Sequence, residues 1–451
     1  MASLKGRIQS RLETLGKSAR RASIDGGLNP DAIRNVLRDR SLSPRWNTLE
    51  GIARGLDWRV EALLGLPSSR TTKEDGKSDY SLAPIVGHHS SMVTVDRASH
   101  EFRRGRPINI RDSSGTSLLA VPSEMATDKA INWLVEMGIS DPAVAITHHR
   151  ARTLKVRLYT DQIVLIPFKF WRSAEIAKTI ADPTADLSNP LRGPYEAIRS
   201  AASEASIAAV QLAKIARLLP SAILVECSQE VEQSFKDEGG YTILDSEIMS
   251  YEMDTAAALK QINSARVPLE NAENTRILSF RSPDGGREHL AIVIGDPPIG
   301  LPVLARIHSE CFTGDLIGSL KCDCGQQLRG AVSQISQEGA GILLYLRQEG
   351  RGIGLTNKLR AYALQDQGFD TVEANERLGF ESDERIFLPA VRILKQLGYQ
   401  TVRLMTNNPD KVEGLQSSGI DVVERVPHAF PSNDHNAFYL SVKKEKSGHL
   451  L

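Results

Sequence analysis

Residues 303–339 read VLARIHSECFTGDLIGSLKCDCGQQLRGAVSQISQEG, and this stretch indicates how the last third of the chain folds. The first six residues are mostly apolar and predict a strand. From Cys324 onward, apolar and small residues recur at helical spacing through CGQQLRGAVSQISQEG, so we expect a helix there. The loop between them contains three of the four cysteines in the chain. A strand, a chemistry-bearing loop and a helix are typical of an α/β domain.

The three clustered cysteines are candidate metal ligands. Thiolates at Cys311, Cys322 and Cys324 would select zinc over magnesium or calcium. Three protein ligands leave one tetrahedral position open, which is the arrangement in which zinc lowers the pKa of bound water. His308 lies nearby in the sequence and could supply a fourth ligand, which would make the zinc structural. The spacing alone leaves both interpretations open.

The rest of residues 260–451 alternates between strand and helix patterns. Apolar runs predict strands, and amphipathic segments predict helices. The strand segments are LAIVIG (290–295), GILLYL (341–346) and TVRLMT (401–406), and the helix segments are LTNKLRAYALQDQG (355–368) and FLPAVRILKQLG (387–398). We therefore expect a separate α/β domain here.

Four segments of this domain closely resemble GTP cyclohydrolase II, the enzyme that opens the riboflavin pathway. They are ARIHSECFTGDLIGSLKCDCGQQL (305–328), LRQEGRGIGLTNKLRAYALQDQG (346–368), TVEANERLGFESDER (371–385) and LMTNNPDKVEGL (404–415). The resemblance extends from residue 260 to the end of the chain, with the segments in the order of the family. It implies that Cys311, Cys322 and Cys324 hold one catalytic zinc in each subunit.

The resemblance also implies roles for individual residues. Asp383 matches the proton acceptor of the family, Arg385 its nucleophile and Tyr362 an active-site tyrosine. The positions that match GTP contacts are Arg306, Ile307, His308, Ser309, Glu310, Gln327, Glu349, Gly350, Arg351, Thr371, Thr406 and Lys411. The implied reaction opens the imidazole ring of guanine with release of formate. It also cleaves the α–β phosphoanhydride to release pyrophosphate, with magnesium on the phosphates. A homodimer is implied as well.

The residue types at these positions suit a nucleotide triphosphate. Arginine forks and the Lys411 ammonium can pair with its phosphates, and Glu349 could accept hydrogen bonds from guanine. Without the resemblance, Asp383 and Arg385 could form a solvated ion pair, and Tyr362 could belong to the core. A guanidinium nucleophile is chemically unfavourable because arginine stays protonated. Arg385 could instead stabilise charge on the α-phosphate.

Residues 86–259 predict a second α/β domain. Its strand segments are RPINIRD, SLLAVP, AVAITH, QIVLIPF and AILVEC, and residues 197–219 predict one long helix. The segment VDRASHEFRRGRPINIRD (95–112) resembles the opening of 3,4-dihydroxy-2-butanone 4-phosphate synthase. That enzyme continues with an acidic metal-binding loop, whereas residues 110–124 read IRDSSGTSLLAVPSE. We therefore expect a catalytically inactive domain, with His148, His149 and Arg150 as surface residues.

Residues 1–68 resemble a helix-turn-helix module. Expected helices are Ser18 to Asp25, Asn29 to Arg40 with Asn29 as N-cap and Pro30 at the first position, and segments near 48–56 and 59–65. The Asn29–Arg40 helix would present Arg34, Asn35, Arg38 and Arg40 to DNA. Residues 1–65 carry 12 basic and 7 acidic side chains, so 12 − 7 = +5. DNA binding through residues 18–65 is one hypothesis, and a docking or dimerisation module is the other.

The whole chain is an α/β (α+β) multidomain protein by these criteria, with residues 69–85 as a linker. Its 55 basic and 55 acidic side chains give no overall field that would attract nucleic acid or a membrane. The sequence shows no secretory signal and no apolar run long enough to cross a membrane, so we expect a cytoplasmic protein. A nucleotide-sensing transcriptional regulator and a cyclohydrolase-like enzyme of another pathway are the alternative functions.

Overall fold

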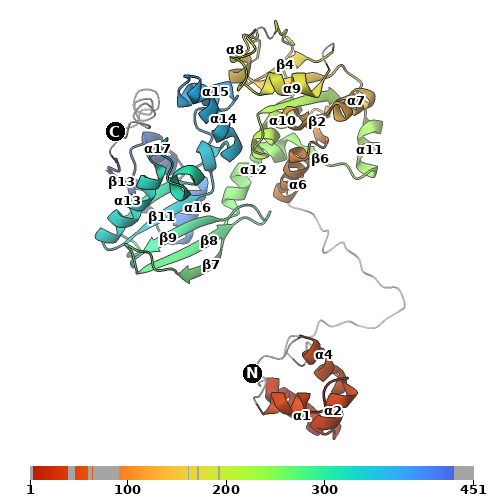
Figure 1. Cartoon of the computed structure of the whole chain (residues 1–451), viewed down its shortest axis with the longest axis vertical. Coiled ribbons are helices and arrows are strands. Elements are labelled where there is room, and N and C mark those ends of the chain that lie inside the picture. Colours follow the sequence, from red (N-terminus) through yellow and green to blue (C-terminus); the bar gives the residue numbers. More distant parts are fainter. Residues whose placement is uncertain are drawn as a thin grey trace. The chain divides into compact units, whose positions relative to one another are not determined.

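A computed structural model of the chain describes residues 4–38, 46–58, 63, 91–160, 162–169, 172–190 and 193–430 (Figure 1). The chain consists of two compact units, Met1–Ile85 and Val86–Leu451. The expected linker at 69–85 and the expected DNA contact Arg40 lie outside the described residues. No helix in the described ranges is long and apolar enough to cross a membrane.

The first unit is a small helical module. Its described helices are α1 (Leu4–Leu15), α2 (Ala19–Asp25), α3 (Ala32–Leu37) and α4 (Trp46–Gly55). They share one apolar core, to which Ile8, Ala22, Ile33 and Ile52 each contribute a fully buried side chain. Ser18 caps α2 by accepting a hydrogen bond from the Arg21 amide, as its position before the helix predicts.

The predicted start of the next helix at Asn29 is wrong. The Asn29 side chain accepts a hydrogen bond from the Asp31 amide at 3.0 Å, which closes a turn before the helix rather than capping it. Pro30 therefore precedes the helix, Asp31 is the N-cap, and α3 ends before Arg38. Tertiary packing of Ile33 and Val36 against the core selects this shorter segment.

The second unit begins with a six-stranded sheet in the order β4-β3-β5-β2-β1-β6. All neighbouring strands are antiparallel except β1 and β6, which are parallel. The strands are β1 (Ile108–Arg111), β2 (Ser117–Pro122), β3 (Ala143–Thr147), β4 (Ile163–Pro167), β5 (Ser221–Glu226) and β6 (Thr242–Leu244). The first four lie within the segments that the sequence predicts, and β5 begins one residue before its predicted segment AILVEC (222–227).

Helices cover both faces of this sheet, because inward side chains alternate along each strand. One face packs against α6 (Ser91–Arg103), α10 (Glu204–Ile215) and α12 (Asp245–Ala257). The other packs against α7 (Asp128–Met137), α8 (His148–Thr153), α9 (Ala174–Ala181) and α11 (Gln229–Asp237). In β2, for example, Leu118 and Ala120 face the first group and Leu119 and Val121 the second.

The long helix predicted over 197–219 is shorter than expected. Ser203 accepts a hydrogen bond from the Ser206 amide and caps the helix, so residues 197–203 remain outside it. At the other end, the Leu218 amide donates to the Ala213 carbonyl, and Arg217 has a left-handed φ of 61°. Alanine content alone would have continued the helix in both directions.

The C-terminal domain contains a seven-stranded sheet in the order β13-β12-β10-β11-β9-β8-β7. The strands β13, β12, β10 and β11 are parallel, and β9, β8 and β7 continue the sheet as antiparallel strands. Their bounds are β7 (Lys260–Arg266), β8 (Thr275–Arg281), β9 (His289–Ile294), β10 (Val303–Ser309), β11 (Gly341–Leu346), β12 (Thr401–Met405) and β13 (Asp421–Val426).

The described part of this domain, up to residue 430, also contains the α-helices α13 (Cys324–Gln337), α14 (Leu355–Asp366), α15 (Thr371–Arg377), α16 (Leu388–Gln396) and α17 (Pro409–Ser417). The strand segments predicted from the sequence correspond to β9, β10, β11 and β12, whereas β7, β8 and β13 were not predicted. The carboxyl ends of the parallel strands β10, β11 and β12 open at one edge of the sheet, where α/β domains bind ligands.

Arg150 is not the surface residue that the sequence predicts. Its side chain is almost fully buried, and its guanidinium pairs with Asp186 while Nε donates to the Ile180 carbonyl at 2.7 Å. The neighbouring His149 lies 3.0 Å from the Glu381 carboxylate of the C-terminal domain. The HHR segment is therefore an internal anchor, because α8 turns these side chains towards two neighbouring elements.

Replacing Arg150 by Met should lower the free energy of unfolding by about 3 kcal/mol, because it leaves Asp186 without its buried cation. Urea denaturation of the full chain measures this loss. The matched control is Arg152→Met on the exposed side of the same helix, which should change stability little. Equal losses in the two variants would show that the buried pair contributes nothing specific.

Candidate active site

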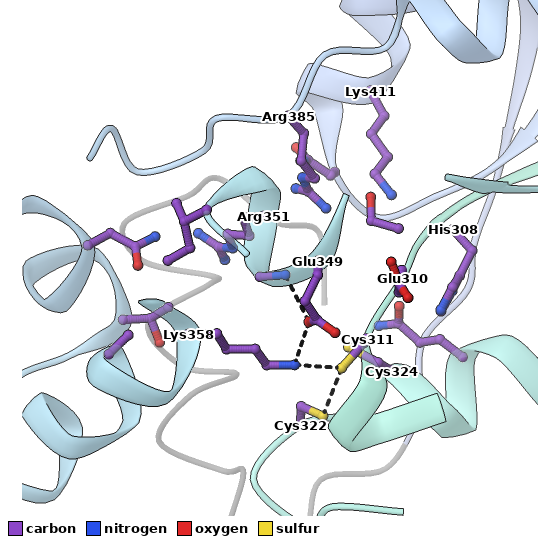
Figure 2. A pocket seen from close by; sticks show the side chains of 18 of the residues that line it. His308, Glu310, Cys311, Cys322, Cys324, Glu349, Arg351, Lys358, Arg385 and Lys411 are labelled. Carbon is purple, nitrogen blue, oxygen red and sulfur yellow. Dashed lines mark hydrogen bonds and ion pairs between the residues drawn. The ribbon is translucent and has the colours of Figure 1, made fainter. Parts of the chain in front are cut away.

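The three predicted metal ligands converge at the carboxyl end of β10. Cys311 follows this strand, and Cys322 and Cys324 lie at the start of α13 (Figure 2). Their sulfur atoms all lie within 4.8 Å of one another, and those of Cys311 and Cys322 are 3.7 Å apart. Zinc–sulfur bonds of ~2.3 Å at tetrahedral angles require sulfur atoms ~3.8 Å apart. The cysteines thus fit a thiolate metal site.

His308 does not complete this cluster. Its Nε2 atom lies 3.0 Å from the Asp315 carboxylate, and its ring stacks against Tyr345 at a centroid distance of 5.6 Å. Within the described part of the chain, the three cysteines form the one group of His, Cys, Asp or Glu side chains close enough to hold a metal ion. The geometry therefore favours the interpretation with an open fourth position.

Gly314 makes room for the sulfur atoms. It belongs to a short π-helical turn over Phe312–Leu316, and its amide donates to the Cys311 sulfur at 3.3 Å. A Cβ atom at Gly314 would lie 2.8 Å from the Cys322 sulfur and 3.1 Å from that of Cys311. Only a residue without a side chain fits this position without displacing a ligand.

Lys358 is a buried member of the site that the sequence analysis missed. Its Nζ lies 3.0 Å from the Cys311 sulfur, 2.9 Å from a Glu349 carboxylate oxygen and 2.8 Å from the Thr313 hydroxyl. Burial alone would lower the pKa of Lys358, but the Cys311 thiolate raises it above its ordinary value. Hydrogen bonds from Cys322 and Cys324, followed by the Lys358 charge, lower the pKa of Cys311. The lysine therefore stabilises the thiolate that a metal needs.

Spacing along one helix could have revealed Lys358. Lys358, Tyr362 and Gln365 all line the pocket beside the cysteines, and they recur at positions i, i+4 and i+7 of α14. Tyr362 lies between two ammonium groups, 5.2 Å from that of Lys321 and 5.8 Å from that of Lys358. Burial raises the pKa of Tyr362 above its ordinary value, so its hydroxyl stays protonated.

A cationic side of the same pocket faces the thiolates (Figure 2). Arg306 reaches from β10, donating to the Met405 carbonyl at 2.8 Å and to Gln327 at 2.7 Å, and burial lowers its pKa to about 10. Lys411, at the start of α17, donates to the Ile307 carbonyl at 2.9 Å. Buried cations attract anions strongly because little solvent screens them.

Two buried polar atoms of this pocket have no partner among the described residues. They are Nε of Arg306 and the hydroxyl oxygen of Ser309. Buried polar groups are nearly always hydrogen-bonded in proteins, so atoms of this kind beside a pocket indicate a bound polar ligand. The sequence analysis named both residues as ligand contacts, and their geometry agrees with that role.

The Glu349–Gly352 turn approaches the pocket in an unusual conformation. Gly350 and Arg351 have φ angles of 63° and 59°, in the left-handed region that non-glycine residues rarely adopt. The Glu349 carboxylate accepts hydrogen bonds from the Phe312 amide at 2.6 Å and from Lys358. Strain of this kind concentrates at functional sites. The left-handed conformation of Gly350 and Arg351 places the backbone of this turn against the ligand pocket.

Arg385 and Asp383 form a two-pronged ion pair, with the arginine Nε 2.7 Å from a carboxylate oxygen. Burial alone would raise the pKa of Asp383, but the Arg385 guanidinium lowers it below its ordinary value. Arg385 lines the pocket, whereas Asp383 lies behind it. The sequence analysis considered a solvated ion pair for Asp383 and Arg385, but the pair in the structure is largely buried.

The structure gathers nearly all residues that the sequence analysis nominated into this one pocket. Ile307 and Asp383 are the nominated residues outside its lining. Thr371 accepts a hydrogen bond from Gln365, and Thr406 accepts one from the Asn408 amide at 3.0 Å. Further lining residues were not nominated: Ile353, Lys358, Ala361, Gln365, Asn375, Asn407, Asn408 and His428.

His428 shows why some of these were missed. It follows β13, and its Nε2 atom lies 2.9 Å from the Gln327 carbonyl on α13. Burial lowers its pKa to about 4, so the ring is neutral near pH 7. No local pattern links His428 to the cysteine loop, and only the order of strands brings them together.

The site thus combines a thiolate cluster that could hold a metal with a cationic pocket suited to a phosphorylated ligand. Residues 260–427 match the family model of GTP cyclohydrolase II. The chain is 47% identical over 365 residues to the GTP cyclohydrolase-2 of Azospirillum brasilense, covering 80% of this chain and 95% of that protein. This chain belongs to the GTP cyclohydrolase II family.

Other similar proteins extend beyond the cyclohydrolase domain. The riboflavin biosynthesis protein RibBA of Parabacteroides distasonis is 33% identical over 401 residues, covering 80% of this chain and 98% of that protein. A two-domain 3,4-dihydroxy-2-butanone 4-phosphate synthase from A. baumannii is a solved structure that matches 74% of this chain and 99% of its own. Its TM-score is 0.31 and its identity 17%, a likeness too slight to indicate activity.

Replacing Gly314 by Ala should reduce bound metal per chain well below that of the wild type, because the new Cβ would lie 2.8 Å from the Cys322 sulfur. Elemental analysis of the purified protein measures the metal. The control is Ile317→Ala in the same loop, which shortens a side chain that is 63% exposed. Full metal occupancy in the Gly314 variant would contradict the assignment of this glycine.

Proposed function

We propose that this chain is a GTP cyclohydrolase II that catalyses the first step of riboflavin biosynthesis. The products are formate, pyrophosphate and 2,5-diamino-6-ribosylamino-4(3H)-pyrimidinone 5′-phosphate. Membership of the family supports this proposal. The observation that carries it is the placement of a three-thiolate cluster and several buried cations on opposite sides of one pocket.

The thiolates are proposed to hold zinc. Three sulfur ligands at this separation suit a tetrahedral metal with one open position. Zinc bound there would supply Lewis-acid activation of water near neutral pH. Lys358 keeps the Cys311 sulfur ionised, and Gly314 keeps space around the cluster. These residues would place the guanine ring of GTP beside the cysteines.

The phosphates of GTP are proposed to lie along the cationic side of the pocket. Arg351, Arg385 and Lys411 line it together with the unpartnered Nε of Arg306. Magnesium would accompany the triphosphate, since this ion is usually bound through phosphate oxygens rather than by a dedicated protein cage. Arginine forks match the geometry of phosphate oxygens, so this side can orient the α–β linkage.

Arg385 is proposed to stabilise charge on the α-phosphate rather than to attack it. Its ion pair with Asp383 favours the protonated guanidinium and fixes its orientation, which suits electrostatic stabilisation. A nucleophilic role would require Asp383 to remove a proton from a group that stays protonated in proteins. Asp383 is therefore proposed to orient Arg385.

The direct test is incubation of the purified protein with GTP, zinc and magnesium, with formate, pyrophosphate and the pyrimidine product measured separately. We expect all three from the wild type and none from Cys322→Ser, which lacks a metal ligand. Formate without pyrophosphate would instead indicate a related enzyme with another product. Absence of every product from a metal-loaded wild type would refute the proposed function.

The role of Arg385 is tested by Arg385→Ala and Arg385→Lys. Loss of a charge that stabilises the transition state should lower kcat by about 10²- to 10³-fold in the alanine variant. The lysine variant should keep more activity, because it retains the charge. Arg392→Ala, an exposed arginine of α16, is the control. A GMP adduct joined to Arg385 through the α-phosphorus, trapped from the wild type by rapid quench, would show that Arg385 is a nucleophile after all.

The middle domain is proposed to have no synthase activity of its own. Asp112, one of two acidic residues in the segment 110–124 that replaces the metal-binding loop, stabilises its own turn. Its carboxylate accepts hydrogen bonds from the amides of Ser114 at 3.0 Å and Thr116 at 2.9 Å. Because the Asp112 carboxylate already accepts these two hydrogen bonds, it is poorly placed to bind a metal ion together with a sugar phosphate. This supports an inactive descendant of the synthase fold.

DNA is a proposed partner of the N-terminal module. Arg20 on α2 and Arg38 after α3 are exposed, and the module carries an excess of positive charge. The two helices join through a turn, as in helix-turn-helix proteins. Arg34 pairs with Asp31 at 2.9 Å and would exchange this partner for a phosphate on binding.

An electrophoretic shift assay of the full chain with duplex DNA tests this partner. Affinity should fall steeply as salt rises, because phosphate binding releases counterions. The triple variant Arg20→Ala, Arg34→Ala, Arg38→Ala should abolish the shift and leave GTP turnover unchanged. A shift that persists in the triple variant would assign DNA binding to another surface.

A further inference from the structure

The middle domain packs directly behind the candidate active site. A shared apolar cluster joins Leu219 and, on α9, Ala181 to residues of the C-terminal domain. Two of those partners, Ile353 and Ala361, also line the site pocket. The wall of the pocket is therefore supported from behind by side chains of a domain that has no assigned chemistry.

An ion pair connects the same domain to the segment that contains Asp383 and Arg385. Lys214, in the last turn of α10, lies 2.7 Å from the Glu384 carboxylate, and both side chains are less than one-fifth exposed. The Glu384 amide donates to the Arg351 carbonyl at 3.0 Å. Lys214 thus holds Glu384, which lies between Asp383 and Arg385 in the sequence. Through the hydrogen bond of Glu384 to Arg351, it also holds the strained Glu349–Gly352 turn beside the pocket.

A second contact reaches the turn itself. Arg217, two residues after α10, donates a hydrogen bond from its guanidinium to the Gly352 carbonyl, and its own carbonyl accepts one from Asn357 on α14. A Cβ at Gly352 would lie 2.8 Å from the Glu384 carbonyl, so the turn and the 381–385 segment are in close contact. Both contacts therefore come from the C-terminal end of α10, Lys214 from its last turn and Arg217 from just beyond it.

The conformation of Arg217 points to a role beyond ending the helix. The Leu218 amide donates to the Ala213 carbonyl and the Arg217 amide to that of Lys214, a helix ending that favours glycine at position 217. Arg217 instead occupies this left-handed position at φ 61°. Its side chain makes a contact that glycine could not make, the hydrogen bond to the Gly352 carbonyl.

We propose that the middle domain acts as a positioning module for GTP hydrolysis, in which Lys214 and Arg217 hold the Glu349–Gly352 turn and the Asp383–Arg385 pair in their reactive arrangement. The inference rests on the proposed function. It gives the inactive domain a function, because catalytic groups displaced by about 1 Å can lose up to 10²-fold in rate. The charged groups of Lys214 and Arg217 do not line the substrate pocket. Lys214 therefore acts through Glu384, and Arg217 acts through Gly352.

A double-mutant cycle on Lys214 and Glu384 tests the first contact. Lys214→Met should lower kcat by about 10-fold while the metal content stays at the wild-type level. The double variant Lys214→Met, Glu384→Gln should be no slower than the slower single variant, because one interaction is lost in each. Lys214→Arg, which keeps the charge, should recover most of the rate.

The matched control is Lys169→Met, which breaks a lysine–carboxylate pair within the middle domain. It should leave kcat unchanged. Melting temperatures of all variants separate loss of positioning from loss of folding. If Lys214→Met lowers the melting temperature but keeps the wild-type kcat, the contact is merely structural and the proposal is wrong.

Arg217→Gly provides an independent test, because glycine relieves the backbone conformation while removing the contact with Gly352. We expect a folded protein with a several-fold lower kcat and a smaller change in KM. Wild-type kcat in this variant would overturn the proposal for Arg217. A wild type that releases no product from GTP would instead refute the proposed function and this inference with it, an outcome distinct from unaffected variants of an active enzyme.

Discussion

The close approach of three cysteine sulfur atoms, all within 4.8 Å of one another, is the constraint on which the site depends. Thiolates at that distance need a compensating cation, and Lys358 supplies part of the charge from α14. The same ammonium pairs with Glu349, whose carboxylate binds the amide after Cys311. The cysteine cluster, the strained Glu349–Gly352 turn and the helix α14 are therefore coupled. A change in the position of one is expected to shift the other two.

The sheet explains why these groups meet. The parallel strands β10, β11 and β12 end at one edge, and each is followed by a segment that lines the pocket. Cys311 follows β10, Glu349 follows β11 and Thr406 follows β12. The middle domain adds support from behind through Leu219, Lys214 and Arg217. The proposed positioning role gives this domain a part in the chemistry of its neighbour.

Much of the fold could be predicted because local periodicity is strong in the buried strands. The runs that became β2, β3 and β11 are nearly continuous apolar segments, as strands covered on both faces should be. Prediction failed where competing local interactions matter, as at Asn29 and Ser203, whose side chains form turns and caps. It also failed for β7, whose residues are all exposed and carry no apolar pattern.

The sequence by itself identified the three candidate metal ligands, since three thiols close together in the chain and a dense motif are local features. It also indicated Arg306, Glu349 and Arg385 as members of one site. Only the tertiary structure decided that His308 pairs with Asp315 rather than joining the cysteines, and that Lys358 does approach them. It alone placed His428 and Arg217, because strand order and domain packing bring together residues that no local spacing connects.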